Sequence, residues 1–265
     1  MTEPRGLWVY AVTEQIPAGS LDQVAGVGGG QVRTVVADGL TAIAEDVPLE
    51  EFGEAALRRN LEDLAWLEET ARAHHRVIDA VVRQSPVVPM RLATVYSGDA
   101  SVAAMLAGRA DDFRAALGRM SRRQEWGVKV YAAERAEANA APAHGGTEDT
   151  GSGGKGAAYL RRRRDQLSAQ QDARRELTVS AELVHGALSQ LAVDSALHPP
   201  QAPQLTGTSA QMLLNAAYLL DEQRSEDFTA AVGALAKSHP ALRLELTGPW
   251  PPYSFAGVEQ EEEAW

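Results

Sequence analysis

The chain has 265 residues and a formal net charge of −11, a size that accommodates one large or two ordinary domains. It has no Cys, which excludes disulfides, thiolate zinc sites and thiol nucleophiles, and its acidic balance argues against a general nucleic-acid-binding protein. No apolar run approaches the ~20 residues of a membrane-spanning helix, and the start, MTEPRGLWVYAV, lacks the basic region of a signal peptide. We therefore expect a soluble, cytoplasmic, globular protein.

The first third of the chain predicts strands followed by one long helix. Leu7–Thr13 is apolar and aromatic and predicts a buried strand, and residues 32–37 and 40–44 predict two strands joined by a hairpin turn at Asp38-Gly39. Apolar residues then recur at steps of three, four or seven. This stripe predicts a single helix over residues 50–84, roughly 50 Å long.

The next elements lead to a break in the pattern. Two prolines end the long helix, and a strand around Met90–Val95, a helix over residues 97–123 and a strand at Trp126–Glu134 follow. From about residue 135 to 156 the sequence is small and rich in Gly, which predicts a flexible loop. We place the boundary between two domains near Arg122–Glu125.

The second half predicts strands and helices in alternation. After the strand at Trp126 we expect a very long helix over residues 157–196, a buried strand within Ser209–Asp221, a helix from Ser225 and a last strand ending near Pro249. This order is most of a split βαβ, ferredoxin-like sandwich.

The predicted fold class is therefore α+β with two domains. The first, residues 1–123, is an N-terminal α+β domain. The second, residues 124–265, is a C-terminal modified ferredoxin-like domain with a long helix. It ends in an acidic tail at residues 257–265.

Two glycine-rich segments resemble phosphate loops but lack the required residues. GVGGG, at residues 26–30, does not have G-x-G-x-x-G spacing and precedes a strand, so no helix N-terminus is available for a pyrophosphate. GSGGKG, at residues 151–156, has Asp149 where a P-loop needs its first Gly and Gly156 where magnesium needs Ser or Thr. We interpret the first segment as a flexible strand connection and expect no cofactor.

The histidines and arginines do not form a catalytic or metal-binding constellation either. His74 and His75 point about 100° apart on a helix, so they cannot bind one ion together, and we expect one at the apolar border and one in solvent. The only basic cluster is RRRR at residues 161–164 with Arg174 and Arg175. A solvated helix face, partly neutralised by nearby Asp and Glu residues, competes here with a contact for an acidic partner.

Aromatic residues gather near the C-terminus, in a stretch that cannot be helical. Trp250, Tyr253 and Phe255 lie among three prolines in LTGPWPPYSF, residues 246–255. One interpretation is that the stretch folds back over the final strand and seals the C-terminal domain. The other is that its rings, each able to bury roughly 150–250 Å², contact a partner.

Six segments in order along the chain carry a resemblance to one family. They are LWVYAV (7–12), LAWLEETARAHHRVIDAVVRQSPVVPMRLATVY (64–96), WGVKVY (126–131), GAAYLRRRRDQ (156–166), AQMLLNAAYLLD (210–221) and LELTGPWPPYSF (244–255). They resemble the gas vesicle proteins of the GvpF/GvpL type. The pairing of HHRVIDAVV and VVPMRLATVY with a terminal LTGPWPPYSF is the most specific part of the resemblance.

The resemblance implies a minor structural or assembly protein of gas vesicles, the gas-filled protein shells found inside prokaryotic cells. It implies binding of the main, small hydrophobic shell protein and of other accessory proteins, two α+β domains with a C-terminal ferredoxin-like one, and no catalysis. Nucleic acid and lipid membrane are not expected partners. Candidate partner contacts are Trp250, Tyr253, Phe255, Arg161, Arg162, Arg163 and Arg164. A small-ligand-binding or enzymatic α+β protein is the alternative.

Overall fold

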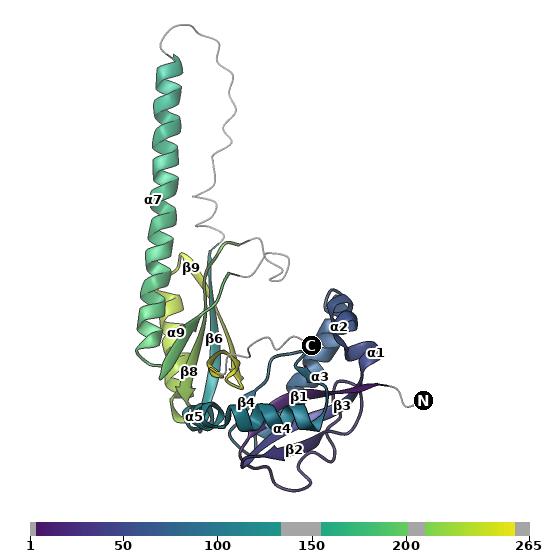
Figure 1. Cartoon of the computed structure of the whole chain (residues 1–265). Helices are drawn as coiled ribbons and strands as arrows, with labels where there is room; N and C mark the ends of the chain where they lie inside the picture. The colour runs from purple at the N-terminus through teal and green to yellow at the C-terminus, as the bar shows by residue number, and fades with distance from the viewer. Residues whose placement is uncertain (1–3, 134–154, 201–209, 258–265) are drawn as a thin grey trace. The chain divides into compact units, whose positions relative to one another are not determined.

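The computed structural model describes residues 4–133, 155–200 and 210–257, which form an α+β chain with two antiparallel sheets (Figure 1). Contacts divide the chain into a first unit, residues 1–125 with 249–265, and a second unit, residues 126–248. The loop predicted at residues 135–156 and the tail at 257–265 lie almost wholly outside the described residues. Lys155 and Gly156, which we assigned to that loop, are helical instead.

The first sheet has strand order β2-β3-β1-β4, with β5 also paired to β1. The hairpin turn predicted at Asp38-Gly39 is confirmed, because both residues have the positive φ, 48° and 73°, that a tight hairpin needs. In place of the single strand expected at Met90–Val95, the chain forms two short strands on either side of it. The strands are β1 (Arg5–Thr13), β2 (Arg33–Ala37), β3 (Leu40–Pro48), β4 (Val88–Pro89) and β5 (Val95–Tyr96).

The helices of the first unit are shorter than predicted. Residues 50–84 form three helices, because Gly53 is extended and Asp63 caps a new helix by accepting from the Ala65 and Trp66 amides at 2.9 and 3.3 Å. Residues 97–123 likewise form two helices, with a break at Arg109. The helices are α1 (Leu49–Phe52), α2 (Glu54–Asn60), α3 (Leu64–Val82), α4 (Asp99–Gly108) and α5 (Ala110–Met120).

The two faces of the first sheet bury two separate cores. Leu7, Val9 and Val12 of β1 pack with α4 and α5, whereas Trp8 and Tyr10 pack with α1, α2 and α3. The register of β1 against β3 shifts between Val9 and Ala11. This bulge places Tyr10 and Ala11 on the same face, which strict alternation does not allow.

The second unit packs two helices against a sheet of order β7-β8-β6-β9. The very long helix predicted at residues 157–196 is present, and its Leu177, Ala181, Val184 and Leu188, which recur at steps of four and three, form an apolar stripe that enters the core. The helix ends at Ser189, however, because residues 194–197 pair with β8 as a strand. The elements are β6 (Arg123–Ala132), α7 (Lys155–Ser189), β7 (Asp194–Leu197), β8 (Met212–Asp221), the short η1 (Glu222–Arg224), α9 (Ser225–Ser238) and β9 (Leu242–Trp250).

Helix α7 continues far beyond the end of this sheet, so that much of its N-terminal half projects from the second unit (Figure 1). Its described residues before Leu177 are mostly exposed. None of the helices in the described part of the chain is both apolar enough and long enough to cross a bilayer.

Candidate functional site

The aromatic stretch forms a C-terminal strap, residues 249–257, that packs on the first unit. It follows Gly248, whose φ of 121° suits only glycine, and it contains the short 3-10 turn η2 (Tyr253–Phe255). Tyr253 packs against the core on the α3 face of the sheet and Ala256 against the core on the α5 face. The expectation that this stretch seals the C-terminal domain is therefore wrong, because its apolar partners belong to the first unit.

A buried carboxylate holds the strap in place. Glu125, only 8% exposed, accepts a hydrogen bond from the Ser254 amide and one from the Ser254 hydroxyl, both at 2.7 Å. Charge-assisted hydrogen bonds of this kind are stronger than neutral ones, and here they offset the burial of the carboxylate. Sequence analysis did not single out Glu125, since its partner lies 129 residues away.

The strap covers His75 of α3 with two rings. The Tyr253 hydroxyl lies 3.4 Å from His75 Nδ1, and the Trp250 ring meets the imidazole edge-on with centroids 5.3 Å apart. Burial raises the pKa of Tyr253, and the charges of Glu125 and Asp79 add to the rise. Tyr253 and Phe255 therefore face inward, whereas the Trp250 side chain remains 42% exposed.

The neighbouring His74 is buried rather than at a solvent border. Its Nδ1 accepts a hydrogen bond from Trp8 Nε1 at 3.0 Å, so its Nε2–H donates to the Met90 carbonyl oxygen at 3.1 Å. Burial lowers the pKa of His74 to about 4. The hydrogen bond to the Met90 carbonyl raises this pKa, whereas the positive charge of His75 lowers it further. The expectation of one histidine in solvent is wrong, because His75 is half-buried under the strap.

We predict that His74 makes the fold less stable in acid. An unfolded chain binds a proton at His74 as the pH falls below about 6.5, whereas the folded chain does not until about pH 4. The stability present above pH 6.5 is therefore lost as the pH falls towards 4, by about 3 kcal/mol in total. Urea unfolding at several pH values measures this loss. If the free energy of unfolding of a His74→Gln variant falls as steeply with pH over this interval as that of the unaltered chain, the assignment is contradicted.

The glycine-rich segment at residues 26–30 encloses a carboxylate of its own chain. Glu45 of β3, 1% exposed, accepts from the Gly30 amide at 2.7 Å, from the Gly28 amide at 3.2 Å and from the Tyr10 hydroxyl at 2.6 Å. The Tyr10 oxygen in turn accepts from the Val27 amide at 2.8 Å. The segment does connect strands, as predicted, but its Gly28 and Gly30 amides also form an anion-binding concavity that Glu45 fills.

The glycines of this segment leave room for that carboxylate. A Cβ atom on Gly26 would lie 2.0 Å from Glu45 Oε2 and 2.4 Å from the Tyr10 hydroxyl oxygen. A Cβ atom on Gly30 would lie 2.9 Å from Glu45 Oε1. The glycine run is thus required by close approach to Glu45, and the sequence signal that accompanies it is a lone Glu inside the apolar strand LTAIAEDVP.

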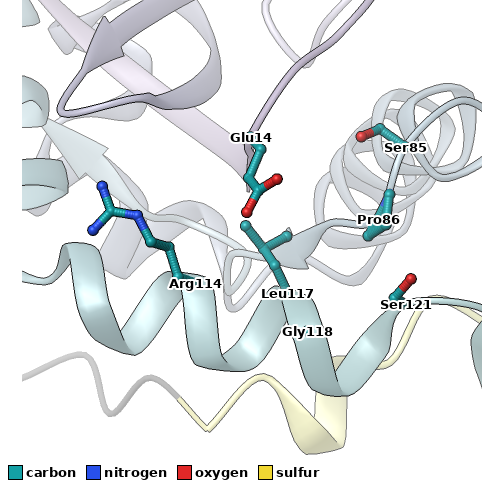
Figure 2. A pocket seen from close by; sticks show the side chains of 7 residues that line it. All are labelled: Glu14, Ser85, Pro86, Arg114, Leu117, Gly118 and Ser121. Atoms are coloured by element: carbon teal, nitrogen blue, oxygen red, sulfur yellow. The ribbon is translucent and has the colours of Figure 1, made fainter.

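A small cavity lies between α5 and the end of β1 in the first unit (Figure 2). Its volume is about 200 Å³, and its only cation, Arg114, is paired with Asp38 at 3.0 Å and with Asp111 at 3.3 Å. Among the described residues, no group of three His, Asp or Glu side chains is arranged to hold a metal ion. The cavity is lined by Glu14, Ser85, Pro86, Arg114, Leu117, Gly118 and Ser121.

The predicted basic cluster lies on α7, in the second unit. The side chains of Arg163 and Arg164 are exposed, whereas those of Arg161 and Arg162 are outside the described part of the chain. Neutralisation was expected from Asp165, Asp172 and Glu176. The side chain of Asp165 is outside the described part of the chain, and the ion pairs between described residues include none of Asp172 or Glu176.

Comparison with known proteins finds matches that extend over both units and the strap. The model of a family described as gas vesicle synthesis protein GvpL/GvpF matches residues 6–257. The chain belongs to the GvpL/GvpF family of gas vesicle proteins. Gas vesicle protein L of Streptomyces sp. (strain CB03234) is 39% identical over 99% of this chain and 97% of its own length. Gas vesicle protein F of the same strain is 26% identical over 94% of this chain and 98% of its own.

Solved structures within the GvpL/GvpF family have the same fold. The crystal structure of GvpF from Anabaena sp. PCC7120 has a TM-score of 0.68 and 19% identity, and covers 98% of this chain and 100% of that one. GvpF from Microcystis aeruginosa has a TM-score of 0.65 and 18% identity, with 95% and 98% covered. The family match confirms the resemblance drawn from the six segments, and with it a role in gas vesicle formation.

Proposed function

We propose that this chain is a minor structural or assembly protein of gas vesicles that binds the small hydrophobic shell protein and assists shell formation without catalysis. The observation that carries the proposal is the family match over residues 6–257. A shell that excludes water displays a large apolar face before it assembles, and such faces aggregate unless they are covered. A helper therefore needs interaction surface rather than an active site.

The proposed location is the gas vesicle, within the cytoplasm, and the proposed partners are the main shell protein and other accessory proteins. Trp250 is the aromatic residue of the strap best placed for such a contact, because more than a third of it is exposed. Tyr253 and Phe255 support it from beneath by anchoring the strap to the first unit. The arginines at residues 161–164 are the second proposed contact, on α7.

The second unit is proposed to be a modified ferredoxin-like domain. Its elements follow one another as β6, α7, β7, β8, α9 and β9, in the order of a split βαβ unit. The sheet order β7-β8-β6-β9 places the first and third of these strands side by side, which supports the same assignment.

Co-expression with the main shell protein tests the proposed function. We expect the two proteins to co-purify at low and at high salt, because apolar contacts are not screened by ions. Trp250→Ala should reduce recovery of the shell protein several-fold, whereas Leu64→Ala, which removes a 71% exposed apolar residue elsewhere, should not. Failure to associate at any salt concentration would remove the proposed binding.

The alternative of a small-ligand-binding or enzymatic protein has little support from the described cavity. Ligand pockets typically span roughly 300–1,000 Å³ and are mostly apolar, whereas the cavity beside α5 is smaller, about 200 Å³. A second hollow, of about 360 Å³ at the junction of α4 and α5, is lined mainly by charged and small residues. A thermal-shift screen against nucleotides, acyl phosphates and divalent metals would detect such a ligand, since binding to the native state raises its melting temperature.

A further inference from the structure

The projecting half of α7 carries two exposed arginine pairs in register. Arg174 follows Arg163 by eleven residues, and Arg175 follows Arg164 by the same interval. Eleven residues are three helical turns plus about 20°, so the pairs lie on one side of the helix about 16 Å apart. All four side chains are exposed.

The described acidic residues nearest to the pairs lie away from the centre of the arginine side. At 100° per residue, Glu176 falls about 160° from that centre and Asp172 about 120° from it, three residues before Arg175. Between the pairs, the arginine side carries Leu167, which is 45% exposed, and the neutral Gln170 and Gln171. One side of the helix is therefore basic with an apolar centre. This side, the α7 basic face, consists of Arg163, Arg164, Leu167, Arg174 and Arg175.

Three exposed arginines of the first unit are ion-paired locally. Arg58 of α2, Arg72 of α3 and Arg83, just after α3, each contact a carboxylate four residues earlier. On α7 the residues four before Arg174 and Arg175 are Gln, and no described carboxylate is ion-paired with the basic face. The guanidinium groups of this face are thus left available for groups outside the described chain.

We propose that the α7 basic face is a docking surface for an acidic protein helix lying along α7. Guanidinium groups bind carboxylates in bidentate pairs, and a helix with acidic pairs eleven residues apart presents them at the same interval as the arginines. Leu167 supplies an apolar contact between the two charged ends. Nucleic acid is a poorer match, because the chain as a whole carries a net charge of −11 and repels a long polyanion.

A binding assay with the full chain tests the proposal without any gas vesicle protein, so its outcome is independent of the proposed function. The probe is a labelled alanine-based helical peptide with Glu pairs eleven residues apart, measured by fluorescence anisotropy at low salt. R163Q/R164Q/R174Q/R175Q should bind it more than tenfold more weakly than the unaltered chain. A peptide of the same composition with the Glu pairs seven residues apart should bind less tightly to the unaltered chain.

The matched control is R58Q/R59Q/R72Q/R83Q, which removes the same charge from exposed arginines of α2, of α3 and of the C-cap of α3. It should bind the peptide within about twofold of the unaltered chain. Equal weakening by both variants would overturn the proposal, because net charge alone would then explain binding. Tighter binding of a duplex RNA than of the peptide would also overturn it, as would self-association of the chain that the α7 variant abolishes.

Discussion

Replacing Glu45 with Ala is expected to lower the free energy of unfolding by about 3–5 kcal/mol. The substitution removes the acceptor of the Tyr10 hydroxyl and of the Gly28 and Gly30 amides in a site that water does not reach. Each buried donor left without a partner costs about 1–3 kcal/mol, and the vacated space adds a cavity.

Urea unfolding measures this loss, with two variants as references. Glu45→Gln should cost less than Glu45→Ala, because its amide oxygen still accepts one or two of the three hydrogen bonds. Glu62→Ala removes an exposed carboxylate and should change stability by no more than about 0.5 kcal/mol. If Glu45→Ala and Glu62→Ala are equally stable, the glycine-rich segment does not depend on the carboxylate.

The same site shows which parts of the fold a sequence can predict. Strand β3, the turn at Asp38-Gly39 and the apolar stripe of α7 follow from residues next to one another in the chain, so local pattern was sufficient. Glu45 acquires its role from a tyrosine 35 residues away and from amides 15 and 17 residues away. Local periodicity contains no information about such contacts.

The predicted ends of the helices were wrong for a related reason. The apolar stripe of α1, α2 and α3 continues across Gly53 and Asp63, because all three helices face the same core. A periodic pattern therefore predicts one helix where the backbone makes three, and only the capping contact of Asp63 marks the true start of α3. The end of α7 was missed because strand β7 is defined by its pairing with β8.

The candidate contact residues divide in the same way. Their presence in one proline-rich stretch is visible in the sequence, and so is the basic cluster of α7. That Tyr253 and Phe255 turn inward while Trp250 stays partly exposed depends on Glu125 and His75, which lie far away in the chain. The division between anchor and exposed residue could be obtained only from the fold.

Replacing Tyr253 with Ala should therefore destabilise the first unit, by about 3 kcal/mol. The ring packs against the core beneath α3, and aromatic truncations at buried sites typically cost about 3–5 kcal/mol. Tyr253→Phe should cost less than about 1 kcal/mol, because it removes only a long contact to His75. Trp250→Ala, at a 42% exposed position, should cost less than Tyr253→Ala.

Hydrogen exchange followed by mass spectrometry identifies which unit is affected. In Tyr253→Ala, deuterium uptake should rise first in α3 and α5, since the strap contacts the cores beneath both helices. Exchange in α9, whose apolar side chains belong to the core of the second unit, should be unchanged. Faster exchange confined to α9 would instead place the strap's stabilising contacts in the second unit, as the alternative packing requires. If the first unit alone responds, Trp250 is carried by a segment whose order depends on the N-terminal sheet, and its proposed contact with the shell protein depends on that sheet as well.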